Sequence, residues 1–118
     1  MTEPIKTIIF VKAQFEAIHS WPNCPHIDVA FLCCPHRHVF HVKLKLHVSH
    51  DDREHEFIRV KRTLEGHLRF NYEGSDLGSK SCEMIAKEIG IYFNQNVGKV
   101  HSVSVSEDNE NGAEVYYE

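Results

Sequence analysis

The sequence predicts an α+β domain in which two helices cover one face of a four-stranded antiparallel sheet. Apolar and polar residues alternate along two long segments near the N-terminus and two short ones near the C-terminus, as in strands buried on one face. Two central segments repeat their apolar residues every three or four positions, as amphipathic helices do. At 118 residues the chain suffices for one domain, 1–118, and is too short for two.

Two strands open the predicted order strand, strand, helix, helix, strand, strand. The first has its alternating row at Ile5, Ile9, Val11, Ala13, Phe15 and Ala17, and the row ends on His19. Residues 20–34 hold Pro22 and Pro25, and Pro35 follows, so this segment is expected to be a loop. The second strand, 36–48, places on one face His36, His38, Phe40, Val42, Leu44, Leu46 and Val48.

The two helices are expected in the middle of the chain. Residues 49–52 offer N-cap side chains for the first helix, which is expected to end at Gly66. Its apolar stripe contains Phe57, Val60 and Leu64. The second helix covers 81–93, with Ser79 or Ser81 as its cap.

Two short strands close the chain. The third strand has an inward row of His101, Val103, Val105 and Glu107. Asn111 and Gly112 supply a turn, and residues 114–117 return as the last strand. An open four-stranded sheet leaves two exposed edges, which a small protein can pair across subunits, so an oligomer is expected.

Composition narrows the classes of function. The formal net charge of -4 disfavours a nucleic-acid binder, because affinity for phosphate backbones comes mainly from clustered Lys and Arg. The apolar stretches fall far short of the roughly 20 residues that a membrane-spanning helix needs. No secretory signal is recognised at Met1–Pro4, so a cytoplasmic location and a small-molecule or protein partner are expected.

Ten histidines and four cysteines point to a metal site. Residues two apart on a strand share a face, so His36 and His38 project together. His19 would arrive beside them if the first two strands pair. Histidine is a common nitrogen ligand of zinc, and catalytic zinc often has three protein ligands. The simpler interpretation of a lone His-x-His is two solvated histidines near a strand end.

Four motifs resemble the pterin synthase family, which includes 6-pyruvoyl-tetrahydropterin synthase and the 6-carboxy-tetrahydropterin synthase of queuosine biosynthesis. The motifs are FEAIH at 15–19, PHRHVFHV at 35–42, SCE at 81–83 and SEDNENGAEVYY at 106–117. Their order also matches, over nearly the whole chain. The resemblance implies the tunnelling fold, in which subunits join their strands into a barrel, as a homo-oligomeric trimer or hexamer with active sites between subunits.

The resemblance also implies a set of site residues. His19, His36 and His38 match the three zinc ligands of the family. Glu107 matches its pterin-anchoring glutamate, although a solvated glutamate at a strand end is the simpler interpretation. Two more positions match residues that hold the pterin, Ser81 and Cys82, while a helix N-cap explains Ser81 equally well.

The catalytic pattern of the family is altered in this sequence. Leu32 stands at the expected cysteine position, so Cys33 would serve only after a one-residue shift of the loop. Cys34 shares the strand parity of His36 and could instead close the zinc site as a fourth ligand. The Asp-His dyad of the family is missing, and His67 could act alone as a proton carrier.

These observations lead to one main functional hypothesis and two alternatives. The main hypothesis is a zinc-dependent lyase resembling 6-carboxy-tetrahydropterin synthase, acting on 7,8-dihydroneopterin triphosphate or a related pterin. One alternative is the same fold with a different reaction or substrate. The other is a non-catalytic, zinc-containing, ligand-binding oligomer.

Overall fold

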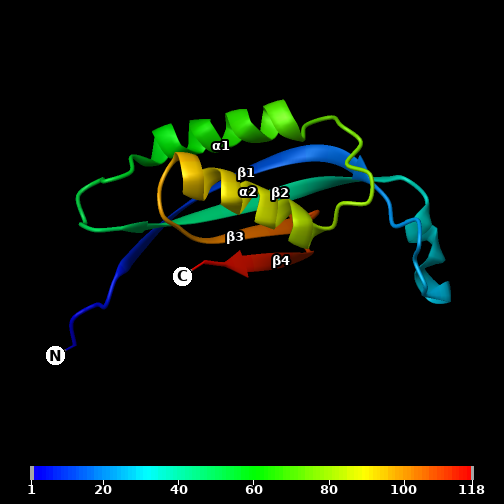
Figure 1. Cartoon of the computed structure of the whole chain (residues 1–118), viewed down its shortest axis with the longest axis horizontal. Helices are drawn as coiled ribbons and strands as arrows, with labels where there is room; N and C mark the ends of the chain where they lie inside the picture. The colour runs from blue at the N-terminus through cyan, green and yellow to red at the C-terminus, as the bar shows by residue number, and fades with distance from the viewer. Residues whose placement is uncertain (1, 118) are drawn as a thin grey trace.

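A computed structural model describes residues 2–117 and confirms the predicted fold class. Four antiparallel strands form one sheet in the order β1-β2-β3-β4, and two helices lie over one of its faces (Figure 1). The elements are β1 (Thr7–His19), the 3-10 helix η1 (Ile27–Cys33), β2 (His36–Val48), α1 (Phe57–Asn71), α2 (Cys82–Asn96), β3 (Val100–Glu107) and β4 (Asn111–Tyr116). The bounds of β2 are those that its alternation predicted.

Strands β1 and β2 pair along their entire length of 13 residues each. His19 lies opposite His36, Ala17 opposite His38 and Phe15 opposite Phe40. Side chains alternate between the two faces of a strand, so all of these residues point to the face that the helices cover. The pairing therefore carries the three histidines to one end of the inward face.

The helices close the core over this inward face. Helix α1 buries Val60, Leu64 and Leu68, and α2 buries Ile85, Ile89 and Phe93 among the rest of its apolar side. The stacked rings of Phe15 and Phe40, with centroids 5.0 Å apart, complete the packing beside the histidines. Burial of each such side chain contributes about 1.5 to 3 kcal/mol to folding.

Three predicted boundaries were wrong, one at the start of β1 and two at the ends of α1. Strand β1 begins at Thr7, and Ile5 is 97% exposed. The N-cap of α1 is Glu56, whose carboxylate accepts from the backbone N–H groups of Ile58 and Arg59, so the polar run 49–52 is not needed for capping. Helix α1 continues through Gly66 to Asn71, because glycine is tolerated in a helix whose apolar stripe continues to Leu68.

The third strand contains an irregularity that its sequence pattern does not reveal. The register of β2 with β3 shifts between Lys45 and Leu46, so that Val100, not His101, joins the inward row. His101 was expected in that row. Its ring instead packs against His47 of the outward row, with centroids 5.3 Å apart. Strand β4 also begins earlier than predicted, at Asn111, because the chain turns over residues 108–110.

The predicted loop 20–34 contains helix η1 and projects beyond the end of the sheet (Figure 1). A second connection, residues 74–78, runs along the edge of β1. Its backbone forms three hydrogen bonds with β1 and one with Ser20, which follows β1. These bonds are Gly74 N–H to Glu16 O, Ile18 N–H to Ser75 O, Leu77 N–H to Ile18 O and Ser20 N–H to Gly78 O. The last third of the β1 edge is thus covered, and the connection then passes beside His19.

None of the helices within residues 2–117 is both long enough and apolar enough to cross a membrane.

Two glycine substitutions test the packing. We expect Gly112→Ala to lower the free energy of unfolding by about 2 kcal/mol, because the added Cβ would collide with the Val105 carbonyl and Ser106 backbone of β3. We expect Gly66→Ala to raise it by about 0.5–1 kcal/mol, because nothing lies within 4 Å of its Cβ position inside α1. Urea denaturation measures both; an unchanged Gly112→Ala protein would contradict the β3–β4 packing.

Candidate metal centre

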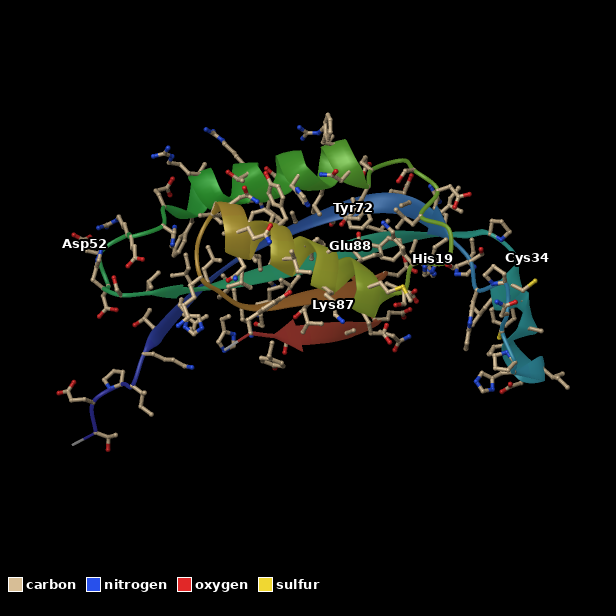
Figure 2. The ribbon with its side chains drawn as sticks, viewed as in Figure 1. His19, Cys34, Asp52, Tyr72, Lys87 and Glu88 are labelled. Atoms are coloured by element: carbon tan, nitrogen blue, oxygen red, sulfur yellow. The ribbon has the colours of Figure 1, made fainter. Side chains whose placement is uncertain are left out.

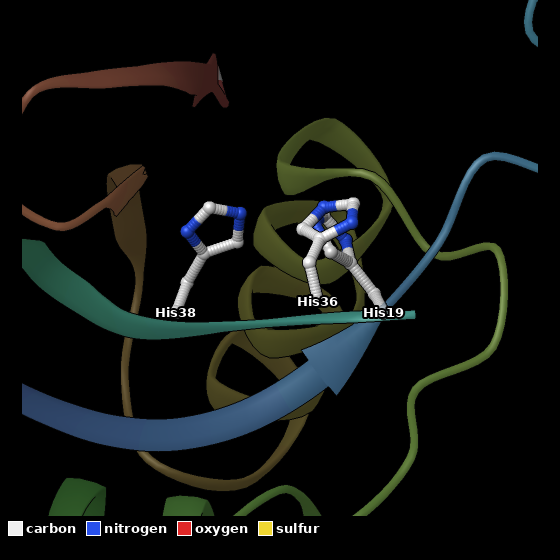
Figure 3. A group of neighbouring side chains, drawn as sticks. All are labelled: His19, His36 and His38. Atoms are coloured by element: carbon white, nitrogen blue, oxygen red, sulfur yellow. The ribbon is translucent and has the colours of Figure 1, made fainter. Parts of the chain in front are cut away.

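The imidazoles of His19, His36 and His38 lie together at the end of the β1–β2 pair (Figure 3). One ring nitrogen from each residue lies within 4.8 Å of one from each of the others. Strand parity predicted this juxtaposition from the sequence. That the three histidines bind zinc stays a prediction.

Two of the rings are oriented by backbone carbonyls. Nδ1 of His19 lies 2.8 Å from the carbonyl oxygen of Lys80, and Nδ1 of His36 lies 2.8 Å from that of Cys34. A carbonyl oxygen can only accept, so Nδ1 carries the proton in both rings. In the neutral form of each ring Nε2 then presents a lone pair, which is the form of imidazole that binds a metal.

The ring of His38 is oriented by a carboxylate. Its Nδ1 lies 2.7 Å from Oδ2 of Asp108. The other oxygen of Asp108 accepts from the N–H of Val39, and the Asp108 N–H donates to the Val39 carbonyl. The hydrogen bond from His38 is the main cause that holds the pKa of Asp108 below its usual value, so this carboxylate is ionised near neutral pH.

The segment that supplies the Lys80 carbonyl is linked to α2 through the Lys80 side chain. Lys80 Nζ lies 3.0 Å from the Glu88 carboxylate on α2, and the Tyr72 hydroxyl donates to the same carboxylate at 2.9 Å. Figure 2 shows Tyr72 and Glu88 in the middle of the molecule, nearer to His19 than to Asp52. Burial, with the contact to Glu88, raises the pKa of Tyr72, so the hydroxyl remains a donor. This network connects the segment before α2, which supplies the acceptor for His19, to α1 and α2.

Two buried ring nitrogens without hydrogen-bond partners indicate that a metal ion fits this donor set. Nε2 of His19 and Nε2 of His38 are buried and have no hydrogen-bond partner within residues 2–117. A buried polar atom without a partner costs about 1–3 kcal/mol. Three anchored imidazoles with free Nε2 lone pairs are the donor set of a three-histidine zinc site, and a cation would satisfy these two atoms.

The carboxylate of Glu107 reaches the same cluster from β3. Oε2 lies 3.1 Å from Nε2 of His19, and Oε1 lies 3.8 Å from Nε2 of His38. The short contact to His19 is close enough for an ion pair but is not aligned as a hydrogen bond. Glu107 lies opposite Phe40 in the sheet register, so it occupies the inward row that the sequence predicted.

A hollow of about 550 Å³ opens beside the cluster. Its walls are formed by residues from β1, the projecting loop, the start of α2 and the β3–β4 end, among them Trp21, Leu32, Ser81, Cys82, Met84, Glu107 and Asn111. The volume falls within the range of small-molecule sites. His19 and His36 line the same hollow, so a ligand there would lie against the candidate metal centre.

Both predicted pterin-holding residues at the start of α2 line this hollow. Ser81 is the N-cap of α2, and its hydroxyl accepts from the N–H of Met84. Burial raises the pKa of the Cys82 thiol to about 12, and the negative charges of Glu107 and Glu83 add to the effect. Cys82 is therefore a neutral, packed thiol and not a nucleophile.

The predicted catalytic residues lie elsewhere in the protomer. Cys33 ends η1 and is exposed, and it does not line the hollow. Cys34 is exposed on the projecting loop (Figure 2), and its thiol is not part of the histidine cluster, while its carbonyl orients His36. His67 stacks on Tyr92 with centroids 4.2 Å apart, and burial lowers its pKa. The protomer thus unites the predicted metal and pterin residues but not Cys33 or His67.

Comparisons with known proteins address the fold. No family model matches the sequence, and no curated protein matches it. The 6-pyruvoyl tetrahydropterin synthase of Caenorhabditis elegans superposes with a TM-score of 0.77 at 13% identity, over 100% of both chains. The chain has the tunnelling fold. An uncharacterized protein from Wolinella succinogenes gives a TM-score of 0.70 at 16% identity, over 98% of this chain and 100% of its own.

Sequence reasoning missed Asp108 and the carbonyl of Lys80. Asp108 directly follows Glu107, and it has a positive φ of 54°, which Asp and Asn adopt more readily than most residues. The SEDN run therefore carried a turn signal next to a predicted site residue. The role of the Lys80 carbonyl has no side-chain signal in the sequence, because any residue could supply that oxygen.

Replacing Asp108 tests how His38 is oriented. In Asp108→Asn, the amide oxygen can still accept from Val39, which leaves the NH2 group facing Nδ1 of His38. That contact favours the tautomer with a proton on Nε2, so we expect zinc affinity to fall about 10–100-fold. Competition with a chromophoric chelator measures the affinity.

Two further variants calibrate this measurement. His38→Ala should abolish stoichiometric zinc. Asp28→Asn removes an exposed charge from η1 and should change nothing. Zinc affinity in Asp108→Asn equal to that of the wild type would show that the Asp108–His38 contact does not support the metal centre.

Proposed function

We propose that this protein is a zinc-dependent pterin enzyme resembling 6-carboxy-tetrahydropterin synthase, acting on 7,8-dihydroneopterin triphosphate or a related pterin. One observation carries the proposal: three imidazoles, each anchored through Nδ1, present their Nε2 atoms beside a hollow that also contains Glu107. The tunnelling fold that it shares with a 6-pyruvoyl tetrahydropterin synthase supports the choice of ligand class.

In this proposal His19, His36 and His38 would hold zinc through their Nε2 atoms. Zinc, when bound, supplies a Lewis acid that polarises the hydroxyl or carbonyl oxygens of the pterin side chain. The chain's own residues orient the ligands through the oxygens described above. Trp21 and Leu32 line the hollow on the side of the projecting loop and would limit the access of water.

Glu107 would fix the pterin ring. The ring offers adjacent N–H and amino donors, and two oxygens of one carboxylate can accept such a pair in one plane. Glu107 is suited to this because its side chain is only 30% exposed and lines the hollow. A charge-assisted pair of this kind contributes about 1.5 to 3 kcal/mol to binding.

A single protomer places neither of the proposed proton carriers at the hollow. Cys33 and His67 remain the proposed proton carriers, and both lie outside the hollow of their own protomer. The enzyme proposal therefore includes a homo-oligomer, a trimer or a hexamer, in which the neighbouring subunit completes the site. The first part of the β1 edge, which the connection 74–78 leaves uncovered, and the β4 edge are suited to pairing across subunits.

The same observation favours a second candidate function. If no neighbour supplies an acid or a base, the anchored histidines and Glu107 remain as a zinc-containing, pterin-binding oligomer without catalysis. The two candidates share the metal and the ligand. They differ in turnover: product formation from 7,8-dihydroneopterin triphosphate supports the enzyme, whereas binding without turnover supports the binder.

Pterin binding is the decisive experiment for both candidates. We expect the zinc-loaded wild type to bind 7,8-dihydroneopterin, and Glu107→Gln to bind it about tenfold or more weakly, because the substitution keeps the shape and removes the charge. Isothermal titration measures both. Glu110→Gln, three residues along the turn, removes the same charge and should bind like the wild type. Absence of pterin binding by the zinc-loaded wild type would contradict the proposed function.

Light scattering tests the proposed assembly. We expect the protein at micromolar concentration to have the mass of a trimer or a hexamer and not that of the 13.7 kDa protomer. The reason is that the uncovered edges of β1 and β4 leave backbone N–H and C=O groups unpaired. A stable monomer would remove the shared active site and, with it, the enzyme proposal.

A further inference from the structure

The carboxylate of Glu107 lies between the candidate metal centre and the hollow. Its two oxygens approach two different imidazoles, at 3.1 Å from His19 Nε2 and 3.8 Å from His38 Nε2. Glu107 is not among the residues whose ligand atoms all lie within 4.8 Å of one another, so its partly exposed side chain would have to move toward His36 to complete a four-ligand site; it lines the hollow as well. Glu107 can therefore coordinate a metal at the histidines or accept hydrogen bonds from a ligand in the hollow.

A cation would stabilise the contact between His19 Nε2 and the Glu107 carboxylate. Nδ1 of His19 donates a hydrogen bond to the Lys80 carbonyl, so a neutral ring would turn the lone pair of Nε2 toward the Glu107 oxygen. Two lone pairs at 3.1 Å repel, and burial weakens the screening of that repulsion. A divalent cation would attract both. A doubly protonated His19 would do so too, and the experiment below separates the two.

Glu107 has no competing partner among the described residues. Its carboxylate accepts no hydrogen bond within residues 2–117, and its only ion-pair contacts are with His19 and His38. The side chain is 30% exposed, so water compensates it only in part. A partly desolvated carboxylate without a donor is stabilised by a cation or by a ligand that brings donors.

We infer that Glu107 is a fourth metal ligand in the substrate-free protein and that a bound pterin withdraws it. The withdrawal rests on the proposed function, whereas the ligand role does not. A pterin held through paired hydrogen bonds occupies both carboxylate oxygens, so the same group cannot also coordinate the metal. Pterin binding would then convert a closed four-ligand site into a three-histidine site with an open position.

Zinc affinity in the absence of pterin tests the ligand role. We expect Glu107→Gln to bind zinc at least tenfold more weakly than the wild type, and Glu110→Gln to match the wild type. Melting of the metal-free proteins controls for folding. Equal zinc affinities of the wild type and Glu107→Gln would overturn the ligand role.

Cobalt(II) substitution tests the withdrawal. We expect the visible spectrum of cobalt-loaded wild type to change when 7,8-dihydroneopterin is added, and Glu107→Gln to have an altered spectrum before any pterin is added. A spectrum that stays constant while titration shows pterin binding would overturn the withdrawal and leave the proposed function intact. Absence of pterin binding would overturn both, while the zinc affinities would still decide the ligand role.

Discussion

The full-length antiparallel pairing of β1 with β2 is the constraint on which the functional end of the molecule depends. It sets His19 opposite His36 and two residue pairs along the ladder from His38, and side-chain alternation turns all three inward. A slip of one residue would send the histidines of one strand to the other face. The apolar row from Phe40 to Leu46 prevents this, because such a slip would expose the core. Core packing thus specifies the geometry of the candidate metal centre.

A polar network completes what the strand pairing begins. Oxygens from three separate segments orient the rings: Lys80 before α2, Cys34 before β2 and Asp108 after β3. Each of these segments is held by further bonds, such as those between Asp108 and Val39. Because two of the three oxygens belong to the backbone, the tautomers of the histidines follow from the fold more than from the identity of neighbouring side chains.

The residues proposed for metal and pterin binding and those proposed for proton transfer lie on different parts of the fold. The candidate metal ligands and the candidate pterin anchor meet within one protomer, on strands whose positions the sheet determines. Candidate proton carriers lie on the projecting loop and on α1, away from the hollow. Strand-borne residues are held by ladder hydrogen bonds, whereas loops vary more readily. This division would allow the fold to keep the candidate site on its strands while Cys33, on the projecting loop, varies.

Sequence periodicity by itself determined the order of elements, the bounds of β2, the inward row of β1 and the meeting of His19, His36 and His38. The order of elements and the inward rows follow from local alternation, whereas the meeting of the histidines also requires that the first two strands pair, as consecutive strands commonly do. Tertiary structure alone decided the bulge that turns His101 outward, the cap at Glu56, and the contact between Asp108 and His38. Such features depend on register and on turn geometry between segments distant in sequence, where one displaced residue changes which side chains meet.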